Sequence, residues 1–149
     1  MLAVYEKVIP SIVKKNRDFF KSRVKKAFVS WLAYKGMLDR VLSPREIELA
    51  RKGILPEDLN IHHKMPLSGS AREDVNDFSN LTVIHKKTHE FINKYVFSPQ
   101  LKKLDKKPFG TKICIEIPEY DFVDKDGILK ERLLARQRYM QRNRLTNSR

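Results

Sequence analysis

The chain has 149 residues and a hydrophobic fraction of 41%, which suits one folded domain with a sizeable core and excludes a wholly disordered chain. A single cysteine, Cys114, excludes a disulfide scaffold and a cysteine zinc cluster. The net charge of +13 favours a polyanionic partner, most often nucleic acid, although a generally basic surface would give the same value.

The positive charge is concentrated on both sides of a nearly neutral middle. Residues 1–50 carry 11 Lys and Arg against 5 Asp and Glu, and residues 99–149 carry 13 against 7. Residues 51–98 carry 7 against 6. A site that needs a cation, flanked by surfaces that need phosphate, would have this distribution.

The N-terminus lacks a cleavable signal pattern, and no apolar run reaches membrane length. We therefore expect a cytoplasmic protein without a membrane partner, or one delivered into a target cell by a route that needs no signal peptide.

Three helices are predicted before residue 54. Apolar spacing predicts a helix over 2–14 with a break or kink at Pro10, and an amphipathic helix over 17–34 that stops near Gly36. The run "SPREIELARKG" at 43–53 predicts a short helix, with Ser43 and Glu46 as a capping box and Gly53 as the C-terminal stop.

The middle of the chain predicts two strands and a helix. Residues 59–63 are expected to form a short strand, 64–79 a polar loop and 80–84 a second strand. Residues 86–97 predict a helix that ends before Pro99.

The rest of the chain predicts a strand and a basic helix. After a lysine-rich connection over 100–112, "KICIEIP" predicts a strand over 112–117 that ends at Pro118, and residues 128–145 predict a helix with five arginines. We expect one α+β domain that is mainly helical. It would comprise a helical N-terminal part (1–53), a core (59–97) and a basic strand-helix extension (100–149).

All four histidines fall between residues 62 and 89, and their spacing predicts a metal site. His89 and Asn93 are four residues apart on a predicted helix and so share one face. If that helix packs across the hairpin, His62 can meet both around one divalent ion.

His63 is expected to have a different task from its neighbour. Adjacent residues of a strand point to opposite faces, so His63 would be free of the ion that His62 binds. A neutral imidazole is suited to accept a proton from water, which makes His63 the candidate general base.

The pattern "IHHKMP…SNLTVIHKKTHEFIN" resembles the HNH, or ββα-metal (His-Me finger), endonuclease motif, in the version found in colicin-type and other bacterial nuclease toxin domains. It covers about residues 59–95. The resemblance implies His62 and His89 as metal ligands, His63 as general base, and Asn80 as the residue that fixes the loop and orients the base. Asn93 stands where colicin-type members have a further histidine, and Ser68-Gly69-Ser70 replaces the usual glycine pair.

The resemblance further implies one divalent ion, whether Mg²⁺, Mn²⁺, Ni²⁺ or Zn²⁺, and products with 5′-phosphate and 3′-hydroxyl ends. Four basic residues outside the motif are candidates for nucleic-acid binding, although each also suits a solvated surface: Lys64, Arg72, Arg136 and Arg142.

We therefore expect a metal-dependent DNA endonuclease with little sequence specificity, because no sequence-reading module is visible. RNA cleavage by the same motif and a non-catalytic nucleic-acid-binding protein are the alternatives. A bacterial toxin or effector role would require an acidic immunity or inhibitor protein as partner.

Overall fold

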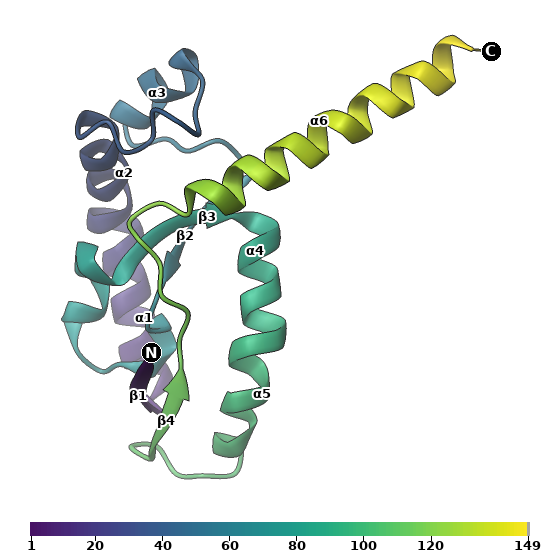
Figure 1. Ribbon diagram of the computed structural model, residues 1–149. Helices are drawn as coiled ribbons and strands as arrows, with labels where there is room; N and C mark the ends of the chain where they lie inside the picture. The colour runs from purple at the N-terminus through teal and green to yellow at the C-terminus, as the bar shows by residue number, and fades with distance from the viewer. Residues whose placement is uncertain (149) are drawn as a thin grey trace.

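The computed structural model describes residues 1–148 as an α+β arrangement of helices around two small antiparallel sheets (Figure 1). The strands are β1 (Leu2–Glu6), β2 (Leu59–His63), β3 (Leu81–His85) and β4 (Lys112–Glu116). The α-helices are α1 (Pro10–Phe19), α2 (Lys25–Tyr34), α3 (Pro44–Arg51), α4 (Lys86–Phe91), α5 (Ser98–Leu101) and α6 (Lys125–Asn147). Within residues 1–148, none of the helices is long and apolar enough to span a membrane.

The hairpin of β2 and β3 positions the two adjacent histidines. The strands pair antiparallel, with His62 opposite Thr82 and His63 opposite Leu81. All five residues of β3 are buried, because Leu81 and Val83 contribute to one hydrophobic cluster and Ile84 to the other. The hairpin is thus fixed between two cores, with the long N-terminal helix on one side and α4 on the other (Figure 1).

The helix predicted over 2–14 is wrong in its first half, where β1 pairs antiparallel with β4. The apolar residues of this segment fit the alternation of a strand as well as they fit the periodicity of a helix. In the strand, Tyr5 is buried while Leu2 and Val4 are exposed. Pairing with β4 provides hydrogen-bond partners for the backbone N–H and C=O groups of a segment that is too short to form a stable helix. The helix begins only at Pro10, whose missing N–H is harmless in a first turn.

From Pro10 the chain is helical as far as Tyr34, with a π-helical segment, η1 (Phe20–Val24), between α1 and α2. The predicted amphipathic helix over 17–34 is therefore confirmed but starts earlier. Phe28 and Leu32 are fully buried, and Gly36 ends the helix with a φ of 72°. The capping box of Ser43 and Glu46 is present as predicted.

The helix predicted over 86–97 does not end at Pro99. A second π-helical segment, η5 (Ile92–Phe97), follows α4 and leads directly into α5. Pro99 is the second residue of α5, which follows directly on the π-helical segment, so the proline does not end the helical run. The predicted strand and the last helix are confirmed within a few residues as β4 and α6.

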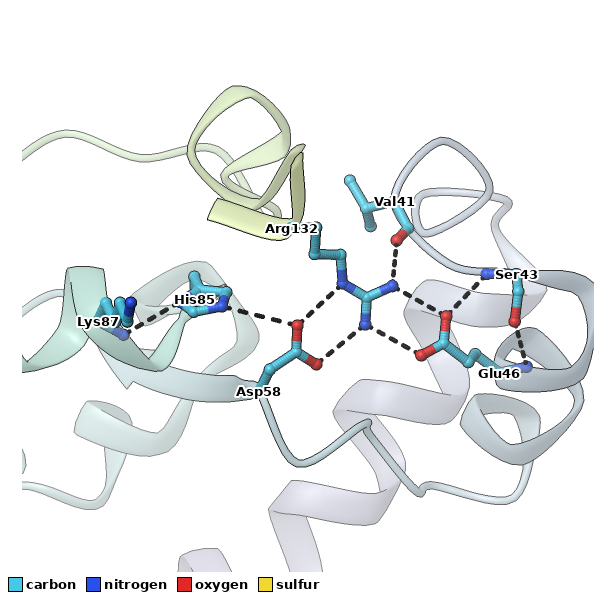
Figure 2. Close-up of polar contacts among 7 residues, drawn as sticks. All are labelled: Val41, Ser43, Glu46, Asp58, His85, Lys87 and Arg132. Atoms are coloured by element: carbon cyan, nitrogen blue, oxygen red, sulfur yellow. Dashed lines mark hydrogen bonds and ion pairs between the residues drawn. The ribbon is translucent and has the colours of Figure 1, made fainter. Parts of the chain in front are cut away.

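Arg132 on α6 joins three parts of the chain (Figure 2). Its guanidinium makes bidentate contacts to the carboxylates of Glu46 and Asp58, at 2.9–3.0 Å, and donates to the Val41 carbonyl oxygen at 2.8 Å. The hydrogen bond from Arg132 is the main reason why the pKa of Glu46 lies below its usual value. Asp58 also lies 3.6 Å from Nε2 of the buried His85, which caps α4 by accepting the Lys87 N–H.

We expect Arg132→Gln to lower the free energy of unfolding by about 2–3 kcal/mol, because it leaves two carboxylates in a partly buried site without a cation. Arg138→Gln removes the same charge from an exposed position of the same helix and should change stability by less than about 0.5 kcal/mol. Urea denaturation at pH 7 compares the two, and equal midpoints would contradict the role given to Arg132.

Candidate functional site

His62 faces α4 and is almost completely buried, with 2% of its surface exposed. Its ring lies 5.3 Å from that of His89, between centroids, and stacks on Phe97. The Nε2 atom is buried and has no hydrogen-bond partner. Burial, followed by the charges of His89, His63 and Lys64, lowers the pKa of His62 to about 3. The imidazole is therefore neutral at pH 7 and has an unused buried nitrogen.

His63 points to the other side of the strand, against the edge of the Phe20 ring at 4.6 Å. Its Nε2 lies 2.9 Å from Oδ1 of the buried Asn76. The amide of Asn76 cannot turn freely, because its Nδ2 donates to the Asn16 carbonyl oxygen at 3.0 Å. Nε2 of His63 must then carry the proton, which leaves Nδ1 as the acceptor. Burial lowers the pKa of His63, while the Asn76 contact opposes this shift.

Asn80 closes the loop between the two strands, as the sequence predicted for it. Its Oδ1 accepts the Met65 N–H at 2.8 Å, and its Nδ2 donates to the carbonyl oxygens of Met65 and Val75 at 3.1 and 2.8 Å. Both ends of the loop are thereby held to one side chain. Because Val75 precedes Asn76, Asn80 also fixes the backbone that presents Asn76 to His63.

We expect Asn80→Ala to destabilise the protein by about 2–3 kcal/mol, since three partly buried backbone groups lose their partner. Ser79→Ala changes an exposed neighbour and should be neutral. The comparison is made by urea denaturation. A variant at position 80 that unfolds at the same midpoint as the control would contradict this role for the side chain.

Gly69 in the same loop is buried against the ring of Tyr5, and any side chain at this position would collide with that ring. The Tyr5 hydroxyl contacts Oγ of Ser68 at 2.7 Å. One glycine within Ser68-Gly69-Ser70 is therefore sufficient to seat the loop on β1.

His89 and Asn93 come from α4 and η5 and line one hollow together with both adjacent histidines. Burial lowers the pKa of His89. Its Nδ1 contacts the Asn60 amide at 3.2 Å. In the structure the Nδ2 of Asn60 donates to Nδ1 of His89. If the Asn60 amide is turned by 180°, its oxygen accepts a hydrogen bond from Nδ1–H of His89 instead. A metal-ligating histidine typically donates its second ring N–H in this way.

The hollow has a volume of about 460 Å³ and brings together four of the predicted site residues: His62, His63, His89 and Asn93. Within residues 1–148, no group of three His, Cys, Asp or Glu side chains is placed to hold a metal ion. A metal site here would thus combine His62 and His89 with the Asn93 amide. A histidine must be neutral to bind a metal ion. Both imidazoles are neutral, and the Nε2 of His62 has no hydrogen-bond partner, so the two rings fit a metal ion.

The four predicted nucleic-acid contacts lie outside this hollow. Lys64 donates to the Ser79 carbonyl oxygen at 3.1 Å and lies over the Phe122 ring in a separate hollow. Arg72 pairs with Asp74 at 3.1 Å. Arg136 and Arg142 are exposed on α6, which projects away from the rest of the fold (Figure 1).

The sequence analysis did not single out the two asparagines whose side chains form polar contacts with the histidines of the hollow, Asn60 and Asn76. Asn60 could have been found, because on β2 it shares a face with His62. Asn76 gave no signal, since it lies among polar loop residues whose fold the sequence does not specify.

Comparisons with known proteins gave no match: no family model, no curated protein and no solved structure matches the chain.

Proposed function

We propose that this chain is a metal-dependent endonuclease of the ββα-metal (HNH) type, which hydrolyses phosphodiester bonds of DNA with little sequence specificity. One observation supports it most. A single hollow joins a histidine whose Nδ1 is free to accept a proton with two neutral imidazoles, one of which has an orphaned buried nitrogen.

His63 is the general base in this proposal. Its Nδ1 takes a proton from a water molecule, and the resulting hydroxide attacks phosphorus while the bond from phosphorus to the 3′ oxygen breaks. The 3′ oxygen takes up a proton from solvent, and the His63 imidazolium returns its proton to solvent, which gives 5′-phosphate and 3′-hydroxyl ends. Asn76 keeps the proton of the resting imidazole on Nε2, and Asn80 holds the loop that carries Asn76.

His62, His89 and Asn93 would hold the divalent ion. When bound, the ion supplies Lewis-acid stabilisation of the negative charge on the phosphate and on the leaving oxygen. Burial keeps both imidazoles neutral and so ready to donate their lone pairs at neutral pH.

The test is cleavage of supercoiled plasmid and, separately, of a structured RNA, in EDTA and with Mg²⁺, Mn²⁺, Ni²⁺ or Zn²⁺. Metal-dependent nicking of plasmid supports the proposal. Cleavage of RNA alone would replace DNA by RNA as substrate, because the site makes no demand on a 2′-hydroxyl. Binding of DNA without cleavage in any metal would overturn the catalytic assignment in favour of a binding protein.

A further inference from the structure

A second hollow of about 570 Å³ adjoins the one that holds the histidines. The two hollows share four lining residues: Phe20, Lys21, Ile61 and His89. One wall of the second hollow comes from η1 and α2, and the other from the chain that runs from Gly53 into β2. The two hollows together thus form a groove that leads away from His62 and His63.

The helical wall of this groove is cationic. Arg17 and Lys21 line the first hollow, and Lys21, Lys25 and Lys26 line the second. Arg17, Lys21 and Lys25 come from α1, η1 and α2 in turn, so the positive charge continues along both hollows.

These four cations are not neutralised by ion pairs within residues 1–148. Two neighbours on the same helix differ in this respect: Lys14 pairs with Asp18 at 2.7 Å and Lys15 with Glu73 at 3.3 Å. Glu57 is the only carboxylate that lines the second hollow. Asp18 also lies near enough for the charges of Lys21 and Arg17 to help lower its pKa, after the hydrogen bond from Lys14. The groove therefore combines four cations outside ion pairs with the apolar ring of Phe20 in its lining.

The opposite wall is fixed close to the lysines. Gly53 has a φ of 85°, and a side chain there would collide with the stem of Lys26. Ser30 on α2 donates to the Arg51 carbonyl oxygen at 2.8 Å, which holds the end of α3 against the same helix. The groove is thus a preformed feature of the fold.

We propose that this groove binds the backbone of the substrate strand beyond the scissile bond, with Arg17, Lys21, Lys25 and Lys26 contacting its phosphates. The inference rests on the proposed function and specifies its substrate. The preferred substrate is then a phosphodiester chain of several nucleotides, and a single phosphodiester is bound poorly. Arg17 and Lys21 line the hollow that holds the histidines, whereas Lys64 and Arg72 lie outside it.

The test uses the double variant Lys25→Gln/Lys26→Gln, which leaves the histidine site unchanged. Its matched control, Lys102→Gln/Lys103→Gln, removes the same charge from an exposed segment elsewhere. Binding of a fluorescein-labelled single-stranded oligonucleotide is measured by anisotropy in EDTA across a salt series, so that no cleavage is needed. We expect the groove variant to raise Kd about tenfold and to reduce the slope of log K against log salt by about 1.4, at about 0.7 per lost phosphate contact. The control should change neither.

Cleavage provides a second, independent measurement. In the groove variant, kcat/KM for the oligonucleotide should fall about tenfold, whereas hydrolysis of bis(4-nitrophenyl) phosphate should be unchanged, since that substrate has no second phosphate. Equal binding losses in the groove and control variants would overturn the groove. If only the groove variant loses binding and the unaltered protein cleaves nothing, the groove is confirmed as a binding site and the proposed nuclease activity is refuted.

Discussion

His63→Ala is expected to lower the rate of plasmid cleavage by about 10²–10⁴-fold, the usual contribution of a positioned general base. The variant removes the one imidazole in the hollow whose ring is held by Asn76 and whose Nδ1 is free. It leaves His62, His89 and Asn93 in place, so metal binding should persist. Single-turnover cleavage at pH 7.5 measures the rate, and isothermal titration with Zn²⁺ measures metal binding.

The matched control is His85→Ala, because His85 is a further histidine of the hairpin but does not line the hollow. It should keep the cleavage rate within about threefold once any loss of folded protein is corrected. If His63→Ala cleaves as fast as the unaltered protein, the base assignment is wrong. If both variants lose activity equally, the loss reports folding instead of proton transfer.

Asn76→Asp gives a finer test of how the base is positioned. Burial lowers the pKa of His63, so activity should be lost only as the pH falls below the ordinary histidine range. A carboxylate at position 76 stabilises the imidazolium, and the acid limb of the pH–rate profile should move upward by about one pH unit. A merely structural Asn76 would change the rate without moving that limb.

The sequence predicted the elements that carry their own local signals. The strand over 59–63, the capping box at Ser43 and the stop at Gly36 are encoded by residues within a few positions of each other. The strand β1 was missed because its partner β4 lies more than 100 residues away, and pairing with it overrides an ambiguous apolar pattern.

The site follows the same division. The spacing predicted that His62, His89 and Asn93 would lie together, and the structure places all three around one hollow. His63 was expected on the opposite face of the strand, and it lines the same hollow. The sequence pattern could not predict the contact of Asn76 with His63 or the cationic wall formed by Lys21 and Lys25. Both depend on how α1, η1 and α2 pack against the loop and the hairpin. These are tertiary contacts between segments far apart in the sequence, which local patterns do not encode.

The metal-free protein is expected to lose stability steeply below pH 6.5, chiefly because of His62. Its pKa is about 3 in the folded state against 6.5 for an ordinary histidine. The unfolded chain therefore takes up a proton as the pH falls through 6.5, while the folded chain does so only near pH 3. The stabilisation is complete above pH 6.5 and decreases between 6.5 and 3, by about 2 kcal/mol at pH 5 for this group.

His62→Leu should flatten this pH dependence, because leucine fills the apolar site and does not titrate. The pKa values of His63, His85 and His89 are also lowered by burial, so part of the slope should remain. Urea denaturation in EDTA at pH 5 and 7.5 gives the two free energies. His85→Gln, which removes a buried histidine outside the hollow, measures how much one such group contributes.

Metal links the same side chain to the proposed activity. Zn²⁺ at pH 7.5 should raise the unfolding midpoint of the unaltered protein and leave that of His62→Leu unchanged, since ligand binding to the folded state stabilises it by mass action. An equal Zn²⁺ shift in both proteins would remove His62 from the metal site, whatever the pH dependence of the apo protein. The other contrary outcome is a stability of the unaltered protein that does not change with pH, together with a full Zn²⁺ shift of its unfolding midpoint. That outcome would show that the His62 ring is exposed enough to be protonated in the folded state. It would contradict the burial that makes His62 a neutral ligand.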